Sequence, residues 1–135
     1  MTREVELSDE EWRGRLSPEQ FEVLRKSATE PAWSGDLLHV DSDGVFHCAG
    51  CGAELFSTDN KFESGSGWPS FDRAMKDGTI EEHQDRSFGM VRTEIRCARC
   101  GGHLGHIFDD GPTDTGQRYC VNSLSLAFTP EDDAD

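Results

Sequence analysis

Two short stretches, 48-CAGCGAELF-56 and 97-CARCGGHLGHIF-108, repeat one pattern in this chain of 135 residues. Each begins with C-x-x-C, continues through glycine and ends in an apolar segment that is too short for a helix. Two similar units that face one another are the natural inference. Paired C-x-x-C turns of this kind hold four thiolates around one metal ion, so they would tie distant parts of the chain together.

The four cysteines of these stretches, Cys48, Cys51, Cys97 and Cys100, predict a tetrahedral site for Zn²⁺, or for iron in the same geometry. Glycine follows Cys51 and Cys100, which allows the chain to turn away from the metal. Four thiolates leave no open position for water or substrate, so we expect a structural site. The alternative is two reduced or disulfide-forming pairs.

The rest of the chain predicts a mainly β domain. Apolar segments punctuated by glycine occupy 44–48, 53–56, 89–97 and 106–108 and are typical of strands. Before them, Ser8 with Glu11 and Ser17 with Gln20 have the spacing of capping boxes, and Pro18 suits a first helical position. We therefore expect antiparallel sheets that form a small barrel-like domain, with two short N-terminal helices that end before Pro31.

Charge and length limit the classes of function. Asp and Glu number 27 against 13 Lys and Arg, and the formal charge of −14 would repel a phosphate backbone, so nucleic acid is not an expected partner. The charge fits either an ordinary acidic surface or adaptation to a salt-rich cytoplasm.

No secretory signal or apolar span is visible, which predicts no membrane association and a cytoplasmic location. We expect one domain over residues 1–135, a monomer, and a solvated acidic tail at 130–135.

The fifth cysteine, Cys120, has no neighbour of its own kind and lies in 118-RYCVN-122. If this segment is a strand, Arg118, Cys120 and Asn122 share one face, and Tyr119 and Val121 share the other. A guanidinium beside a thiol favours the thiolate, which is the nucleophilic form. The alternative is that Cys120 is a small core residue, because cysteine is often buried.

Two further clusters could serve a reactive thiol. The stretch 101-GGHLGHIFDDGP-112 places His103, His106, Asp109 and Asp110 in what we expect to be a glycine-rich loop, where the histidines could donate protons. Structural histidines or a second metal site are the alternatives. In 65-GSGWPSF-71, Trp68 precedes a proline and could form an apolar wall at a pocket, or could simply pack in the core.

Together, 65-GSGWPSF-71, 92-RTEIRCARCGGHLGHIFDDGP-112 and 118-RYCVNSLSLAF-128 resemble the methionine sulfoxide reductase B family, whose members reduce the R epimer of methionine sulfoxide. The resemblance runs from about Leu16 to Phe128. It implies that Cys120 is the nucleophile and becomes a sulfenic acid. It also implies roles for the following residues: His103, His106 and Asp110 in a hydrogen-bonded network near the sulfoxide oxygen, Arg118 and Asn122 beside the nucleophile, and Trp68 against the substrate methyl group.

The chain differs from a common form of the family at Ser66, where many members carry a cysteine that resolves the sulfenic acid as a disulfide. The resemblance therefore implies that an external thiol, either a thioredoxin-like protein or a small molecule, reduces Cys120 directly. It also implies that oxidised protein methionines are substrates. Two readings compete with an oxidoreductase: a zinc-ribbon binding module without catalysis, and a hydrolase with a metal at His103 and His106.

Overall fold

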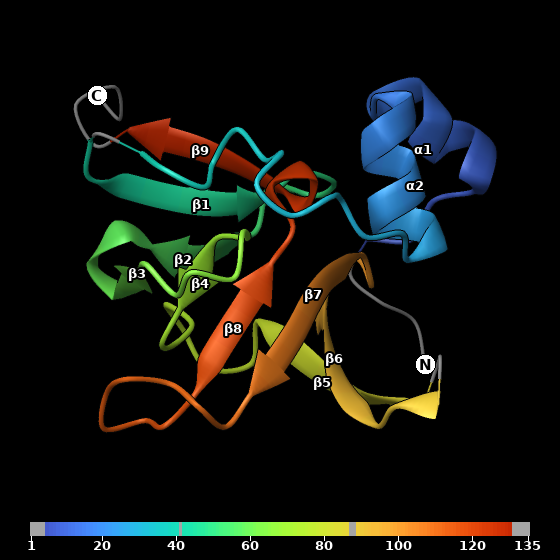
Figure 1. Cartoon of the computed structure of the whole chain (residues 1–135). Helices are drawn as coiled ribbons and strands as arrows, with labels where there is room; N and C mark the ends of the chain where they lie inside the picture. The colour runs from blue at the N-terminus through green and yellow to red at the C-terminus, as the bar shows by residue number, and fades with distance from the viewer. Residues whose placement is uncertain (1–4, 41, 87–88, 131–135) are drawn as a thin grey trace.

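The computed structural model describes residues 5–40, 42–86 and 89–130 as two helices followed by short strands (Figure 1). The helices are α1 (Asp9–Arg15) and α2 (Pro18–Lys26), and two 3₁₀ turns are η1 (Thr58–Asn60) and η3 (Ser123–Ser125). The strands are β1 (Gly44–Cys48), β2 (Glu54–Ser57), β3 (Lys61–Phe62), β4 (Ser70–Phe71), β5 (Ile80–Asp85), β6 (Arg92–Cys97), β7 (His103–Phe108), β8 (Arg118–Val121) and β9 (Leu126–Pro130).

Both helices begin at the predicted capping boxes. The backbone N–H of Glu11 donates to Ser8 Oγ at 3.1 Å, and the N–H of Ser8 donates to the Glu11 carboxylate at 3.2 Å. Ser17 and Gln20 exchange the same pair of hydrogen bonds at the start of α2. Each box satisfies two backbone groups that a helix end would leave unpaired. Helix α2 ends at Ser27, whose φ of 60° is left-handed, so it stops before Pro31 as predicted.

All strand pairs are antiparallel, which confirms the mainly β fold. One sheet has three strands in the order β2-β1-β9, and the other has six in the order β3-β4-β8-β7-β6-β5. In Figure 1 the small sheet lies above the large one, and the helices lie beside them near one end of β7. Strand β8 therefore has a neighbour on each side, β4 and β7, and Cys120 lies within it.

Apolar side chains from the helices and from both sheets form one core. The fully buried aromatic residues are Trp12, Phe21, Phe46, Phe56 and Phe71. Phe56 stacks on Phe71 with ring centroids 4.3 Å apart, and Phe46 meets the edge of Phe71 at 5.1 Å. These contacts join β1 and β2 of the small sheet to β4 of the large one, so the two sheets hold each other in place.

Two sequence expectations concern the limits of the chain. The predicted acidic tail begins at Pro130, the last residue of β9, and its residues 131–135 lie outside the described part. Neither helix in the described part has the length and apolar character that a bilayer span requires.

Candidate active site and metal centre

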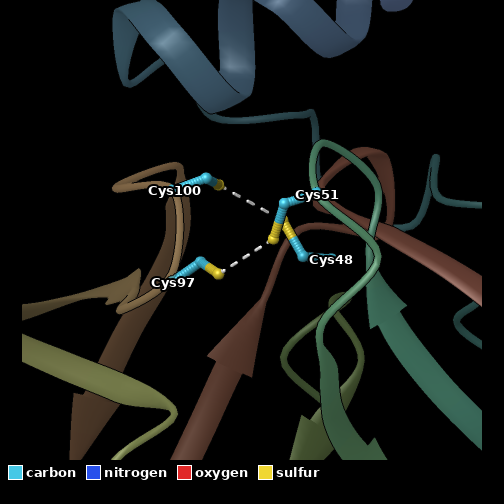
Figure 2. A group of neighbouring side chains, drawn as sticks. All are labelled: Cys48, Cys51, Cys97 and Cys100. Carbon is cyan, nitrogen blue, oxygen red and sulfur yellow. Dashed lines mark hydrogen bonds between the residues drawn. The ribbon is translucent and has the colours of Figure 1, made fainter. Parts of the chain in front are cut away.

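The four paired cysteines converge where the turn after β1 meets the turn after β6 (Figure 2). The sulfurs of Cys48 and Cys100 are 3.7 Å apart, those of Cys51 and Cys97 are 3.6 Å apart, and all four lie within 4.8 Å of one another. A tetrahedral ion with Zn–S bonds of about 2.3 Å separates its sulfur ligands by about 3.8 Å. The cysteines are free rather than disulfide-bonded, so the spacing fits a single bound metal ion.

The four thiols are close enough to shift one another's pKa values. The pKa of Cys48 is raised, first by its hydrogen bond with Cys100, and the pKa of Cys100 is lowered to about 7 by the same contact. Thiolates held this close need a cation to balance their charge. The donor set therefore suits a metal ion in both geometry and chemistry.

Arginines anchor the cysteine turns to the rest of the fold. Arg15 of α1 donates to the carbonyl of Gly50 at 3.2 Å, and Arg25 of α2 donates to the carbonyl of Cys100 at 3.0 Å. Arg99, between the second pair of cysteines, donates to the carbonyl of Cys51 at 3.0 Å. The helices and the opposite turn thus fix both halves of the metal site.

The fifth cysteine lies on β8 and lines a cavity of about 250 Å³. Arg118, Cys120 and Asn122 line this cavity, while Tyr119 points to the core and packs on the edge of Phe56. The predicted alternation along the segment is therefore confirmed for these four residues. The cavity is lined by Thr29, Ser66, Trp68, Arg92, Gly105, His106, Phe108, Arg118, Cys120, Val121 and Asn122.

The histidines lie on strand β7, which confirms the strand predicted at 106–108 and extends it back to His103. The glycine-rich loop expected around the two histidines was therefore wrong. The glycine between them, Gly105, lets β7 approach β8 closely, because a Cβ at this position would collide with the carbonyl oxygen of Cys120 on β8. The β6–β7 register shifts between Ile95 and Arg96, and this bulge allows residues three apart to share a side. As a result, the centres of the two imidazole rings are 5.7 Å apart.

Each histidine is held by a carboxylate that the sequence did not single out. His106, which lines the cavity, shares a hydrogen bond of 2.8 Å between its Nε2 and Asp85 of β5. His103 is buried behind it and shares a hydrogen bond of 2.6 Å between its Nδ1 and Glu94 of β6. Within the described part of the chain, the only group of histidine, cysteine and acidic residues close enough to hold a metal is the four cysteines. The predicted alternative of a second metal at these histidines therefore has no support.

The buried pair of His103 and Glu94 has shifted pKa values. Burial lowers the pKa of His103, although its hydrogen bond with Glu94 acts in the opposite direction. Burial alone would raise the pKa of Glu94, but hydrogen bonds with Arg96 and His103 outweigh it, so the net pKa is lowered. A neutral His103 beside an ionised Glu94 follows at neutral pH.

Arg118 is paired with Asp110 rather than left free for the thiol. Its Nε and Nη2 donate to the two Asp110 oxygens at 2.8 and 3.2 Å, and its guanidinium lies 4.4 Å from the centre of the Phe108 ring. Asp110 was expected in a network with the histidines, but the partners that hold those rings are Asp85 and Glu94. The ion pair explains the lowered pKa of Asp110 and the raised pKa of Arg118.

Arg118 favours the thiolate of Cys120, as expected, but burial outweighs its effect on the pKa of this thiol. Burial raises the pKa of Cys120, and the hydrogen bond with Ser66 and the charge of Arg118 offset this only in part. The nearby carboxylates of Glu30 and Asp110 raise the pKa further.

Trp68 and Asn122 are fixed by the backbone of Glu30. The indole Nε1 of Trp68 donates to the Glu30 carbonyl at 3.0 Å, and the Glu30 N–H donates to Asn122 Oδ1 at 3.1 Å. Asn122 also donates to the Leu104 carbonyl at 3.0 Å, so both ends of its amide are occupied. Gly67 has a φ of 92°, which lets the loop before Trp68 turn closely against Ala32. Trp68 is thus a rigid cavity wall rather than a core residue.

A row of three serine hydroxyl groups lies near Cys120, on the side of strand β4. Ser66 Oγ is 3.8 Å from the sulfur of Cys120 and 2.8 Å from Ser64 Oγ, which in turn is 2.7 Å from Ser70 Oγ. A cysteine at position 66 would stand next to Cys120. The serine that replaces it can form a hydrogen bond but no disulfide.

The structure brings five of the predicted residues to one cavity: Trp68, His106, Arg118, Cys120 and Asn122. His103 contacts the cavity only through His106, and Asp110 only through Arg118. Arg92 and Phe108 also line the cavity but were not predicted. Asp85 could not be recognised from the sequence, because its contact with His106 depends on the register of three strands.

A family model described as the SelR domain matches residues 16–130. Several curated relatives are named peptide methionine sulfoxide reductase MsrB. The relative from Leptospira interrogans is 55% identical over 131 residues, which cover 97% of this chain and all of that protein. The relative from Methanosarcina mazei is 53% identical and covers 96% of this chain and 92% of its own length.

Among solved structures, the Yippee-like domain of Mis18 shares the fold. It has a TM-score of 0.52 and 19% identity, with 64% of this chain and 95% of that chain covered. At this identity the likeness concerns the fold alone.

Proposed function

The chain belongs to the methionine sulfoxide reductase B family and reduces the R epimer of methionine sulfoxide, and we propose that Cys120 is the thiol that carries out the reduction. The observation that supports this assignment is that Cys120 lines one cavity together with Trp68 and His106. The other four cysteines are clustered at the metal site.

In the proposed reaction the sulfur of Cys120 attacks the sulfoxide sulfur. The S–O bond of the substrate breaks, the oxygen moves to Cys120 with a proton, and methionine leaves as the thioether. Cys120 is oxidised to a sulfenic acid and the sulfoxide is reduced, so the step needs no other redox group. Its thiol proton, held by the raised pKa in the free enzyme, is available for the departing oxygen.

We assign the proton-donating role to His106, since it lines the cavity and lies opposite Cys120 in the β7–β8 register. Asp85 accepts a hydrogen bond from its Nε2–H, so Nδ1 can take up the thiol proton of Cys120 and deliver it to the sulfoxide oxygen. His103 with Glu94 supports this ring from behind. Arg118 with Asp110 completes one end of the cavity, and Asn122 fixes the chain beside the nucleophile.

Selectivity for the R epimer follows from the positions of Trp68 and His106 in the cavity. A sulfoxide sulfur carries a methyl group, an oxygen and the methionine chain in a pyramid. If the methyl group packs on Trp68 and the oxygen faces His106, one epimer presents its sulfur to Cys120. The other epimer would place its methyl group against polar side chains.

We infer that the four-cysteine site binds a structural Zn²⁺. Cys48, Cys51, Cys97 and Cys100 provide a closed set of soft ligands, and the metal would fasten the ends of β1 and β6. The ion would contribute to stability rather than to the reaction.

The family implies oxidised protein methionines as substrates and a thiol as reductant, consistent with repair of oxidised proteins. We propose that the thiol reduces Cys120 directly, because Ser66 occupies the place next to it. The reductant would be a thioredoxin-like protein or a small thiol. We further propose a single-domain monomer over residues 1–135 that acts in the cytoplasm.

The test is Cys120→Ser, assayed with each epimer of N-acetylmethionine sulfoxide supplied separately. The parent should reduce the R epimer alone, and the variant should be inactive with its zinc content unchanged. Retained activity in Cys120→Ser, or comparable turnover of both epimers by the parent, would refute the assignment.

A further inference from the structure

The two strands beside Cys120 place different chemistry on its two sides. In the β7–β8 register Cys120 lies opposite His106, and in the β4–β8 register it lies opposite Ser70. The hydroxyl row of Ser64, Ser66 and Ser70 is on the β4 side. The sulfur therefore has a histidine side and a serine side.

Displacement at sulfur requires the attacking atom to approach opposite the leaving atom. In the proposed reaction the sulfenic oxygen is left on the histidine side, where His106 can protonate it as water. A thiolate that attacks Cys120 must then arrive from the serine side. Ser66, at 3.8 Å from the sulfur, marks that line of approach.

A hollow of about 380 Å³ opens on this serine side, formed by the loop after β3 and the loop before β8. We call it the β3–β8 hollow, and the argument uses its residues Glu63, Ser64, Ser66, Asp110 and Arg118. It shares Ser66 and Arg118 with the substrate cavity, and Ser66 is the lining residue that lies within 3.8 Å of the Cys120 sulfur.

We propose that the β3–β8 hollow admits the reducing thiol, and that it favours a thiol with a positive charge near its sulfur. This inference rests on the proposed role of Cys120. Glu63 and Asp110 are largely exposed in the hollow, at 64% and 66% of their side-chain surface. Asp110 already neutralises Arg118, and the chain as a whole carries −14 charges. Lys61 offsets Glu63 in part, because its Nζ lies 3.7 Å from the Glu63 carboxylate. The negative potential at the entrance therefore comes mainly from the net charge of the chain, and Glu63 adds to it.

The reaction in the hollow balances in two steps. A thiol R–SH attacks the sulfenic acid, the S–O bond breaks, and Cys120–S–S–R and water form. A second R–SH then attacks the mixed disulfide, which yields the Cys120 thiol and R–S–S–R. The external thiol supplies both electrons.

The experiment separates the two halves of the turnover. Sulfoxide without reductant gives the rate of methionine formation, and preformed sulfenic acid mixed with thiol gives the rate of reduction. The probes are cysteamine (cationic), 2-mercaptoethanol (neutral) and 2-mercaptoethanesulfonate (anionic), each compared at equal thiolate concentration and low salt. Glu63→Lys is the test variant, and Glu22→Lys on the exposed face of α2 is its control, because it changes the net charge equally.

For Glu63→Lys, with each rate expressed relative to that with 2-mercaptoethanol, we expect reduction by cysteamine to slow about fivefold and reduction by the sulfonate to accelerate about fivefold, as a change of two charges acting across about 8 Å of water would give. Glu63→Gln should show a smaller change in the same direction. Methionine formation should stay within about twofold of the parent, and Glu22→Lys should leave the preference between thiols nearly unchanged.

Two results would overturn the hollow as the thiol entrance: an unchanged preference in Glu63→Lys, or an equal change in Glu22→Lys. Failure of the proposed function would look different, since no sulfenic acid would then form on Cys120 in the first half of the turnover.

Discussion

Replacement of Gly105 by alanine should damage activity far more than the added methyl group suggests. Gly105 lies on β7 opposite Val121 of β8, and it lines the substrate cavity. A Cβ at this position would collide with the carbonyl oxygen of Cys120, and would lie 3.0 Å from its carbonyl carbon and 3.1 Å from Cα of Val121. These are backbone atoms, so no side-chain rotation relieves the contact.

The strands must therefore separate locally, by about 1.5 Å, to restore ordinary van der Waals distances. That shift moves His106 relative to Cys120, since these residues are paired across the same two strands. A misplacement of 1 Å in reacting groups costs about 100-fold in rate. Overpacking of this kind lowers the free energy of unfolding by about 1–3 kcal/mol.

The assay compares Gly105→Ala with Gly14→Ala, by kcat/KM for the R-sulfoxide and by thermal unfolding. Gly14 lies in α1 with nothing within 4 Å of an added Cβ, so its replacement should leave activity unchanged and stabilise the helix by up to about 1 kcal/mol. If Gly105→Ala kept the activity and stability of the parent, the close approach of β7 and β8 would not position the site as described.

Three other predictions concern the metal, the thiol and the proton donor. Cys48→Ser should lose bound zinc and lower the unfolding free energy by several kcal/mol, as zinc analysis and thermal unfolding would report; a metal-free protein of equal stability would contradict a structural role. Glu30→Gln should lower the pKa of Cys120, because it removes a negative charge that disfavours the thiolate, so the pH midpoint of alkylation should fall; an unchanged or higher midpoint would contradict this. His106→Asn should slow methionine formation by about 100-fold or more while alkylation of Cys120 continues at the parent rate; an unaffected reduction rate would exclude His106 as the proton donor.

Features set by neighbouring residues were predictable from the sequence. Ser8 and Ser17 predicted the helix starts, because a capping box is a local pattern. The paired cysteines predicted the four-cysteine cluster, because the spacing within each pair is set by one turn. Strand β5 was missed, since its residues are mostly charged or polar and only partly buried. Short strands such as β3 and β4 have too few residues to show an alternation.

The parts of the site that depend on strand register were not predictable. Asp85 reaches His106 across β5, β6 and β7, and a bulge decides where His103 faces. The glycine of the H-L-G-H segment was interpreted as a loop residue, although it permits two strands to approach. The resting state of Cys120 also depends on burial, which outweighs the nearby Arg118.

Mass spectrometry of the intact protein after reaction with R-sulfoxide, without any reductant, tests the central claim most directly. We predict the addition of one oxygen atom, located on Cys120 by a sulfenic-acid probe, with one methionine released per chain and the four metal ligands unmodified. A disulfide between Cys120 and a metal-site cysteine, or methionine release without oxidation of Cys120, would contradict it.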